Sequence, residues 1–376
     1  MRGAITQIAG KFITMTPMSD NDIYDYIFIG SSPLSLLQAL KSADEGARIL
    51  VLNKQNQLGG CWSWMSQDGL AYERAAHLIE ALPGVYDVLQ QASGERFVDA
   101  STQPERQFSG LLKFKMAYFS KLFLLGALVK ISLELVLSAL SGRREMYFNS
   151  KVKLAHWFSV NPELLVSKLP KVKVPEAGYV AFIQGLVERC GEKGVAFQEG
   201  QIDECIDDGR VWLVKATNGT QWRAKHLVMA SSVPMVETAD GHLVAGTADM
   251  RQRLSVVLEI ADQFRSRAFS YVSLVNHKQI KRIVDVTDKT QIPPGYGHYL
   301  FELSMTHSGL DKLSQSEMNA LAVSSCLFQK NTAAQRRFSS ISEYSIVTNG
   351  LTSRDRLTVL DSFGNLAVGV KAWAQL

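Results

Sequence analysis

The first strong pattern in the chain is an apolar run, a helical segment and a second apolar run. Tyr24–Ile29 (YDYIFI) is apolar and aromatic, ends at Gly30, and predicts a buried parallel strand. Leu34–Ala43 has helical spacing, and Arg48–Leu52 (RILVL) predicts a second buried strand. A strand, a helix and a strand within about thirty residues predict a βαβ unit with a right-handed crossover.

Apolar runs return much later in the chain and predict a sheet that the chain revisits. The elements predicted for this sheet are a helix at Gly178–Arg189 and strands at Val195–Gln198, Val211–Ala216, His226–Ala230 and Asn365–Val370 (NLAVGV). The segment 251–356 reads as an antiparallel substrate domain, with strands at Val272–Val275, Ile283–Val286 and His298–Leu303 and a helical run at Ser314–Phe328. The pattern therefore predicts the α/β class with a second, interleaved domain.

Residues 111–173 differ from the rest because they are both apolar and basic. Leu122–Leu140 is strongly apolar yet contains Lys130 and Glu134, one helical turn apart, which a membrane-spanning helix tolerates poorly. The stretch holds eleven Lys or Arg against three Glu and no Asp. Two interpretations stay open: a buried helical cap over a substrate site with a solvated basic edge, and peripheral contact with an anionic membrane.

Composition narrows the function classes. The chain is 46% hydrophobic and 20% charged, as in a globular protein of about two domains, and its net charge of +4 gives no argument for nucleic acid. The four cysteines form no CxxC pair, no secretory signal precedes the first strand, and residues 1–20 read as a loose extension. A cytoplasmic setting is expected. Neither cysteines nor histidines have zinc-ligand spacing, so no metal site is predicted.

The turn after the first predicted strand carries a partial dinucleotide fingerprint. Such a turn needs a tight first glycine, a second where the backbone meets the diphosphate, and a third for helix packing. Gly30 keeps the first, whereas Ser32 and Ser35 replace the other two. Serine hydroxyls and helix N-terminal amides still suit a phosphate, and Pro33 suits the helix start. The second strand ends in Asn53, followed by Lys54, where an acidic residue usually binds the ribose.

The continuation adds a family resemblance. Residues 51–62 (VLNKQNQLGGCW) resemble the segment after the second strand in the FAD-dependent amine oxidase, phytoene desaturase and UDP-galactopyranose mutase superfamily, with its apolar strand, polar loop and glycine pair. The resemblance implies a Rossmann-type FAD-binding fold with FAD as cofactor. The cofactor-binding residues that this implies are Gly30, Ser31, Ser32, Pro33, Leu34, Ser35, Asn53, Lys54, Gly59, Gly60, Cys61, Trp62, Ile202, Ala230 and Gly369.

Later blocks extend the resemblance. Residues 69–79 (GLAYERAAHLI) look like the family block that approaches the flavin, with Ala76 in place of a glycine and His77 as the candidate catalytic residue. Gly178 with its helix, Ile202 and Ala230 resemble the second cofactor segment. At the C-terminus, Val370 replaces the usual acidic residue and the long helix that should follow is missing.

The resemblance implies a domain division. The FAD-binding domain would comprise residues 21–108, 175–245 and 357–376, the helical cap 109–174, and the substrate domain 246–356.

Three functions stay open at this point. The first is an FAD-dependent oxidoreductase that acts on a small or lipophilic molecule. The second is a flavin-dependent mutase, for which Arg251, Arg253, Arg265 and Arg267 are available to bind a sugar diphosphate, unless they form a solvated helix face. The third is a binding or partner protein that keeps the fold with little or no flavin.

Overall fold

The fold is described from a computed structural model of the chain. The described parts are 23–55, 57–108, 114–117, 121–142, 147, 150–151, 154, 158, 171–230, 233–239, 241, 243–245, 249–287, 292–304, 313–346, 356–360, 366–367 and 369–370. The predicted N-terminal extension, residues 1–20, lies outside them.

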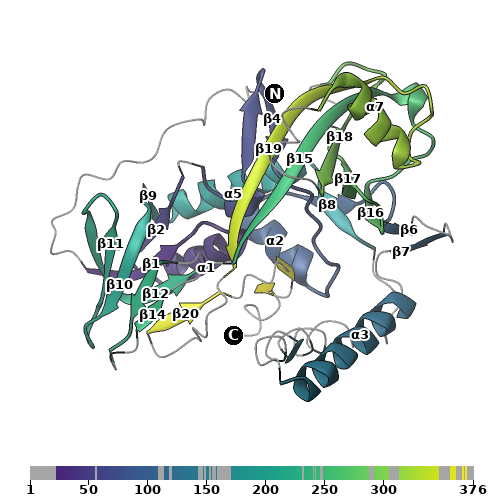
Figure 1. The fold of residues 1–376 in the computed structure, drawn as a ribbon. Helices are drawn as coiled ribbons and strands as arrows, with labels where there is room; N and C mark the ends of the chain where they lie inside the picture. Colours follow the sequence, from purple (N-terminus) through teal and green to yellow (C-terminus); the bar gives the residue numbers. More distant parts are fainter. Residues whose placement is uncertain are drawn as a thin grey trace.

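The first domain is built on a nine-stranded sheet with a parallel centre (Figure 1). β1 (Ile23–Ile29) lies between β2 (Ile49–Asn53) and β12 (Gln221–Met229) and is parallel to both. α1 (Pro33–Asp44) connects β1 to β2, which confirms the predicted βαβ unit. The remaining strands of the sheet are β9 (Ala196–Glu199), β10 (Ile202–Asp207), β11 (Trp212–Ala216), β13 (Met235–Glu237), β14 (Leu243–Ala245) and β20 (Leu357–Val359).

The two faces of this sheet bury alternate residues of its central strand. Phe28 points into the core that is formed with α1, α2 (Val85–Ser93) and α5 (Gly178–Glu192). Ile27 and Ile29 point into a second core with the β10–β11 hairpin. A strand covered on both faces is apolar at nearly every position, which is why the YDYIFI run predicted it.

The second domain is a seven-stranded sheet in the order β19-β15-β18-β17-β16-β6-β7. Its two long strands, β15 (Asp249–Ala261) and β19 (Ala334–Ile346), run antiparallel side by side between the two domains (Figure 1). One face packs on α7 (Gln315–Ser324), whose capping box joins Ser314 and Glu317. The other strands are β6 (Glu105–Phe108), β7 (Phe114–Ala117), β16 (Tyr271–Val275), β17 (Ile280–Asp285) and β18 (Tyr296–Leu303).

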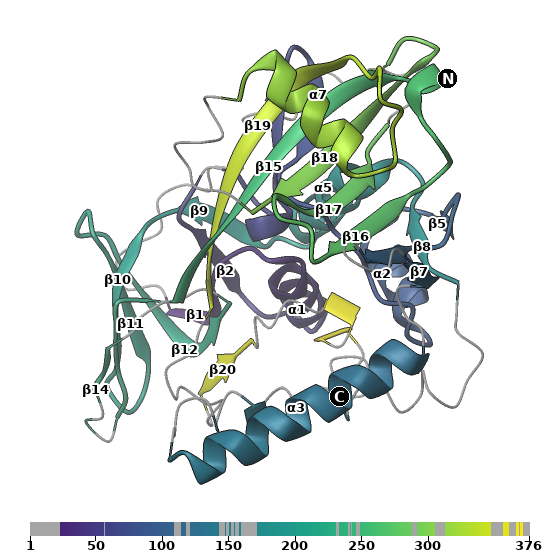
Figure 2. The ribbon, with the colours of Figure 1, turned by 45° about the vertical axis from the view of Figure 1, so that its right-hand side comes forward.

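Smaller elements complete the structure. A hairpin of β3 (Trp64–Gln67) and β4 (Leu70–Glu73) extends from the first domain toward the second sheet, and β5 (Phe97–Asp99) pairs with β8 (Lys173–Pro175). Helix α3 (Lys121–Leu140) lies at the lower edge of the molecule, on the side away from the second sheet (Figure 2).

Three sequence-based expectations are corrected. Leu366, Ala367, Gly369 and Val370 are helical, and the last strand of the first sheet is β20, which pairs with β12. The apolar segment was misread because a short buried run has no periodicity that separates a strand from a helix.

The second correction concerns the arginines. Arg251 and Arg253 lie on strand β15, and Arg265 and Arg267 lie in the turn after it, so they do not form a helix face.

The third corrected expectation is the boundary that separates the first domain and the helical cap from the second sheet. β6 and β7, assigned by sequence to the first domain and the cap, belong to the second sheet, because β6 pairs with β16.

Candidate functional site

The β1–α1 turn has the geometry of a phosphate-binding turn. Gly30 has φ of 98°, a left-handed value that a residue with a side chain rarely adopts. Ser32 caps α1, because its Oγ accepts a hydrogen bond from the Ser35 amide, and Pro33 occupies the first turn. The first turn of α1 contains no acidic residue, so its positive helix end is available to an anion.

Asn53, at the ribose position, is held by the protein itself. Its Oδ1 accepts a hydrogen bond from Ser31 Oγ at 2.9 Å, and its Nδ2 donates to the carbonyls of Gln55 and Gln57 at 2.5 and 2.8 Å. An aspartate has no donor for those two carbonyls. The asparagine therefore fixes the loop after β2, and its side chain is directed inward.

The glycine pair joins this loop to the turn. The Gly59 amide donates to both the carbonyl and the Oγ of Ser31, at 3.0 and 3.1 Å. Gly59 has φ of 102°, and a Cβ there would lie 2.9 Å from Ile183 Cγ2 on α5, so both backbone and space require glycine. Gly60 faces Ser32, whose Cα would lie 3.6 Å from a Cβ at Gly60. The two loops thus meet at the start of α1.

The other predicted cofactor residues surround the same point. The Gly200 amide, two residues before Ile202, donates to the Asn53 carbonyl, and the Ala230 amide donates to the Ile29 carbonyl, both at 2.9 Å. A Cβ at Gly369 would lie 2.6 Å from Leu34 Cδ2, so the C-terminal segment packs on the first turn of α1. Lys54 is exposed. The structure therefore brings the predicted residues together at the carboxyl ends of β1, β2 and β12.

His77, the predicted catalytic residue, is buried against Trp62. Their rings stack with centroids 4.0 Å apart and an interplanar angle of 13°, and Tyr179 meets Trp62 edge-on at 5.4 Å. Trp62 ends the short 3₁₀ helix Gly60–Trp62, which begins at the second glycine of the pair. The stack therefore links the loop of the glycine pair to the block that carries His77.

Glu73 is a partly buried acid that sequence reasoning did not single out. Its Oε2 is enclosed and has no hydrogen-bond partner in the described part of the chain. Burial raises the pKa of the carboxyl to about 8, although the Tyr179 amide at the start of α5 acts against this. The side chain is consequently protonated at neutral pH. Its position between Tyr72 and His77 in the flavin-facing block was the available signal, since strongly shifted acids gather at functional sites.

The hairpin of the first domain meets the second sheet directly. Tyr72 stacks on Phe338 of β19, with centroids 5.5 Å apart and planes at 7°. Ala76 lies in the same buried cluster as Val257 and Leu300 of the second sheet. The block predicted to face the flavin and the predicted substrate sheet are therefore neighbours in space.

A charged network lies beside this contact. Glu259 accepts hydrogen bonds from Arg337 at 2.7 Å and from His298 at 3.1 Å. Burial alone raises the pKa of Glu259, but these two partners outweigh it and leave the pKa below its usual value. Burial also lowers the pKa of His298. Arg337 therefore balances the charge of Glu259, and His298 is a neutral hydrogen-bond donor to it.

A polar row crosses the sheet on the face toward the first domain. Ser255 of β15 is in register with Ser340 of β19 and with Glu302 of β18, and Glu302 is in register with Arg282 of β17. Arg282 and Glu302 form an ion pair at 3.2 Å. The hydroxyls of Ser255 and Ser340 are buried and have no hydrogen-bond partner among the described residues. Unsatisfied buried hydroxyls in a row are suited to a polar group of a ligand.

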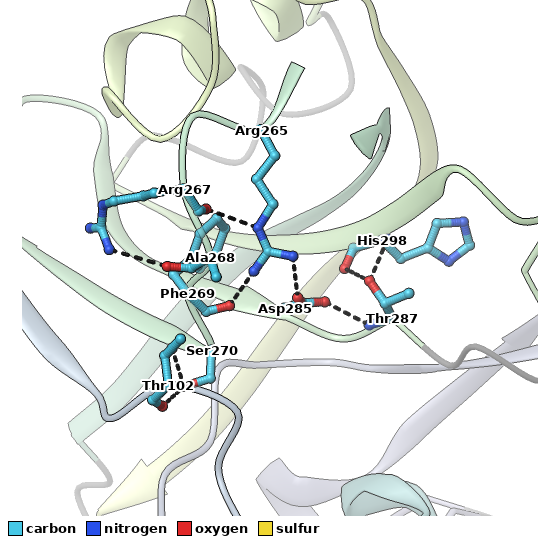
Figure 3. A network of polar contacts seen from close by, with 9 residues as sticks. All are labelled: Thr102, Arg265, Arg267, Ala268, Phe269, Ser270, Asp285, Thr287 and His298. Atoms are coloured by element: carbon cyan, nitrogen blue, oxygen red, sulfur yellow. Dashed lines mark hydrogen bonds and ion pairs between the residues drawn. The ribbon is translucent and has the colours of Figure 1, made fainter. Parts of the chain in front are cut away.

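The arginines considered for sugar-diphosphate binding are already occupied where they are described. Figure 3 shows Arg265 directed at Asp285, with an ion pair of 3.1 Å and hydrogen bonds to the carbonyls of Arg267 and Phe269. Arg267 pairs with Glu105 of β6. These contacts fasten the turn after β15 to neighbouring strands, so the two guanidinium groups have structural roles.

The described residues contain no cluster of histidine, cysteine or acidic side chains that would hold a metal ion. Within the same residues, no helix has the length and hydropathy needed to span a bilayer.

Comparisons with known proteins identify the fold. Neither a protein-family model nor a curated protein sequence matches the chain. Cyclohexylamine oxidase from Brevibacterium oxydans is 12% identical, with a TM-score of 0.63 over 94% of this chain and 98% of that chain. An oxidoreductase from Methanosarcina mazei is 13% identical, with a TM-score of 0.60 over 93% of this chain and 100% of that chain.

A putrescine oxidase variant with redesigned cofactor binding is 10% identical to the chain, with a TM-score of 0.58 over 93% of this chain and 96% of that chain. At this identity the similarity establishes the fold alone. The chain has the fold of amine oxidases over nearly its whole length, which confirms the predicted α/β class.

Proposed function

We propose that the chain is an FAD-dependent oxidoreductase of the amine-oxidase type that acts on a small or lipophilic molecule. The observation that carries the proposal is the meeting of two glycine-containing loops at the uncharged first turn of α1, in a chain with the fold of amine oxidases throughout. That arrangement is the one by which a backbone approaches a dinucleotide diphosphate.

The residues suit the diphosphate of FAD better than its ribose. Gly30, Gly59 and Gly60 have left-handed φ values and place backbone without side chains near the positive end of α1, which suits a diphosphate. Asn53 offers no carboxylate to the ribose, and its polar atoms are already bonded. The proposal therefore assigns most of the binding to the diphosphate turn and to the backbone near Ile202, with a small contribution from the ribose position.

When bound, FAD would accept a hydride from a carbon of the substrate. The residues of the chain would bind and orient the cofactor and the substrate. The block from Tyr72 to His77 would border the cofactor, and the polar face of the second sheet would form the opposite wall. Ser255 and Ser340 would orient a polar substrate group there, and Glu73, protonated at neutral pH, would add no negative charge beside the cofactor.

The test is a titration of the purified chain with FAD, followed by the visible spectrum after gel filtration. We expect flavin absorption to stay with the protein. Ser32→Asp keeps a good N-cap but puts a negative charge beside the diphosphate, so it should weaken FAD binding about tenfold or more, whereas the neutral cap in Ser32→Asn should bind normally. A wild-type chain that does not retain flavin would refute the proposal.

One observation favours a second function. Ser31, Asn53 and Gly59 satisfy one another's polar groups without any ligand. Such self-sufficiency suits a partner protein that keeps the fold without the cofactor. The same titration separates the two, because this function predicts a folded, colourless chain whose melting temperature does not change with FAD.

The mutase function has less support. It requires arginines free to bind a sugar diphosphate, and Arg265 and Arg267 are instead held by Asp285 and Glu105.

A further inference from the structure

Helix α3 exposes a large apolar surface although its other side is anchored. Ala127, Leu128 and Ile131 pack against the core of the first domain. The side chains on the opposite side are large, apolar and between 47% and 81% exposed: Leu125, Val129, Leu133, Val136, Leu137 and Leu140. Soluble proteins rarely expose so many contiguous apolar side chains unless the surface binds something.

The exposed residues form one stripe. Except for the adjacent pair Val136 and Leu137, they are three or four positions apart, so at ~3.6 residues per turn they follow one side of the helix from Leu125 to Leu140. Figure 2 shows that this helix lies along the outer edge of the molecule. The stripe is therefore accessible to a flat partner.

The charges around the stripe are positive. By the same helical geometry, Lys121 lies at one edge of the stripe and Lys130 at the other. Lys130 is 78% exposed, and its contact with Glu134 at 4.0 Å is a weak surface pair. Tyr147 and Phe158 are also exposed, and residues 111–173 hold eleven basic side chains against three acidic ones. A partner that is apolar at its centre and anionic at its surface complements this pattern.

We propose that α3 docks in the headgroup region of an anionic membrane and lies in the plane of the interface. The apolar stripe would enter the boundary of the acyl chains, while the lysines at its edges reach lipid phosphates. The helix lies on the bilayer rather than across it, because its other side is packed on the domain core. A second copy of the chain fits less well, since a symmetric interface would bring the same lysine edges together.

The test uses the full chain in flotation with vesicles of phosphatidylcholine alone and of phosphatidylcholine with phosphatidylserine. We expect binding to the second kind. Val129→Glu with Leu133→Glu should lower the apparent affinity about tenfold or more, since two charges replace buried apolar groups. The matched control, Gln221→Glu with Gln263→Glu, adds the same two charges at exposed positions outside α3 and should bind as wild type.

A second variant separates the electrostatic contribution to vesicle binding from the apolar contribution. Lys121→Gln with Lys130→Gln should weaken binding to the anionic vesicles about twenty-five-fold, because each lysine near such a surface contributes roughly fivefold. Circular dichroism checks that each variant folds. A wild-type chain that stays unbound, or a glutamate variant that floats as well as wild type, would overturn the proposal. So would a wild-type dimer that the glutamate substitutions convert to a monomer while no vesicle binds. None of these readouts needs a cofactor.

Discussion

The two domains each contain a buried glutamate, and the two carboxyl groups have opposite pKa shifts. Glu73 of the first domain has an enclosed Oε2 without a partner in the described residues, and its pKa is raised to about 8. Glu259 of the second sheet has a side chain that is only 10% exposed, but its pKa is lowered. The two carboxyl groups differ in the partners that stabilise their charged forms.

The two glutamates have different protonation states because, among the described residues, only Glu259 has a cationic partner. Arg337 and His298 hold Glu259 in its charged form, so that acid is part of the framework of the sheet. Glu73 has one amide donor and no ion pair within the described residues, so it keeps its proton at a cost to the folded state when the pH rises. A buried acid that stays unpaired at a domain junction is a sign of a functional site rather than of structural need.

The comparison is tested most strongly by Glu73→Gln. A raised pKa means that stability is fully present below about pH 4.5 and is lost as the pH rises toward 8, because the unfolded chain releases its proton first. At ~1.4 kcal/mol for each pH unit, the wild type should lose about 3 kcal/mol more than the variant between pH 5 and pH 8. Urea unfolding at several pH values measures this difference.

The control for this prediction is Glu80→Gln, a nearby acid for which the wild-type pH dependence should persist. Parallel pH profiles for wild type and Glu73→Gln would show that Glu73 is ionised in the folded protein, and the contrast with Glu259 would then disappear.

Arg337→Met should convert Glu259 into an acid like Glu73. The substitution leaves a buried charge with only a neutral histidine, and we expect a loss of about 3 kcal/mol in the free energy of unfolding at neutral pH. The loss should be smaller near pH 5, where His298 can take a proton and replace the missing cation. Unfolding with urea at both pH values gives the two numbers.

A double variant sharpens this test. Arg337→Met with Glu259→Gln removes the charge as well as its partner, so it should recover most of the lost stability. If it is no more stable than the single variant, the cost arises from lost packing of the arginine stem, and Glu259 does not need a cation.

Much of the fold was predictable because local patterns agree with the three-dimensional structure. The apolar runs at β1 and β2 are continuous because both faces of the strands are covered, and Gly30 marks the turn between β1 and α1. The segment 366–370 failed because the same apolar pattern suits a short buried helix. The assignment of β6 to the second sheet was not predictable, since its partner β16 lies more than 160 residues away in the sequence.

The sequence predicted where the candidate site lies, but it did not predict the hydrogen bonds and the pKa shift within the site. The glycines and serines of the two loops were recognisable in the sequence, and the left-handed φ values of Gly30 and Gly59 show why glycine is required there. The inward direction of Asn53 depends on carbonyls in its own loop, and the high pKa of Glu73 depends on its enclosure beside α5. The polar row of Ser255 and Ser340 needs the register of two strands. Such contacts between distant segments leave no local pattern.

The smallest expected effect comes from placing a third acid, in addition to Glu73 and Glu259, at position 53. Asn53→Asp introduces a carboxylate that faces the carbonyls of Gln55 and Gln57, to which the asparagine donates hydrogen bonds. Loss of these donors should cost about 2 kcal/mol, and the deficit should shrink as the pH falls and the new acid takes up a proton. Thermal melts at pH 4.5 and pH 7.5 measure both the loss of stability and its pH dependence.

The control variant is Ser31→Ala, which removes a hydrogen bond to the same asparagine without adding charge. It should cost about 1 kcal/mol with no such pH dependence. If Asn53→Asp is instead as stable as wild type, the loop after β2 rearranges readily, and the ribose position is open to a ligand in the way that the cofactor hypothesis requires.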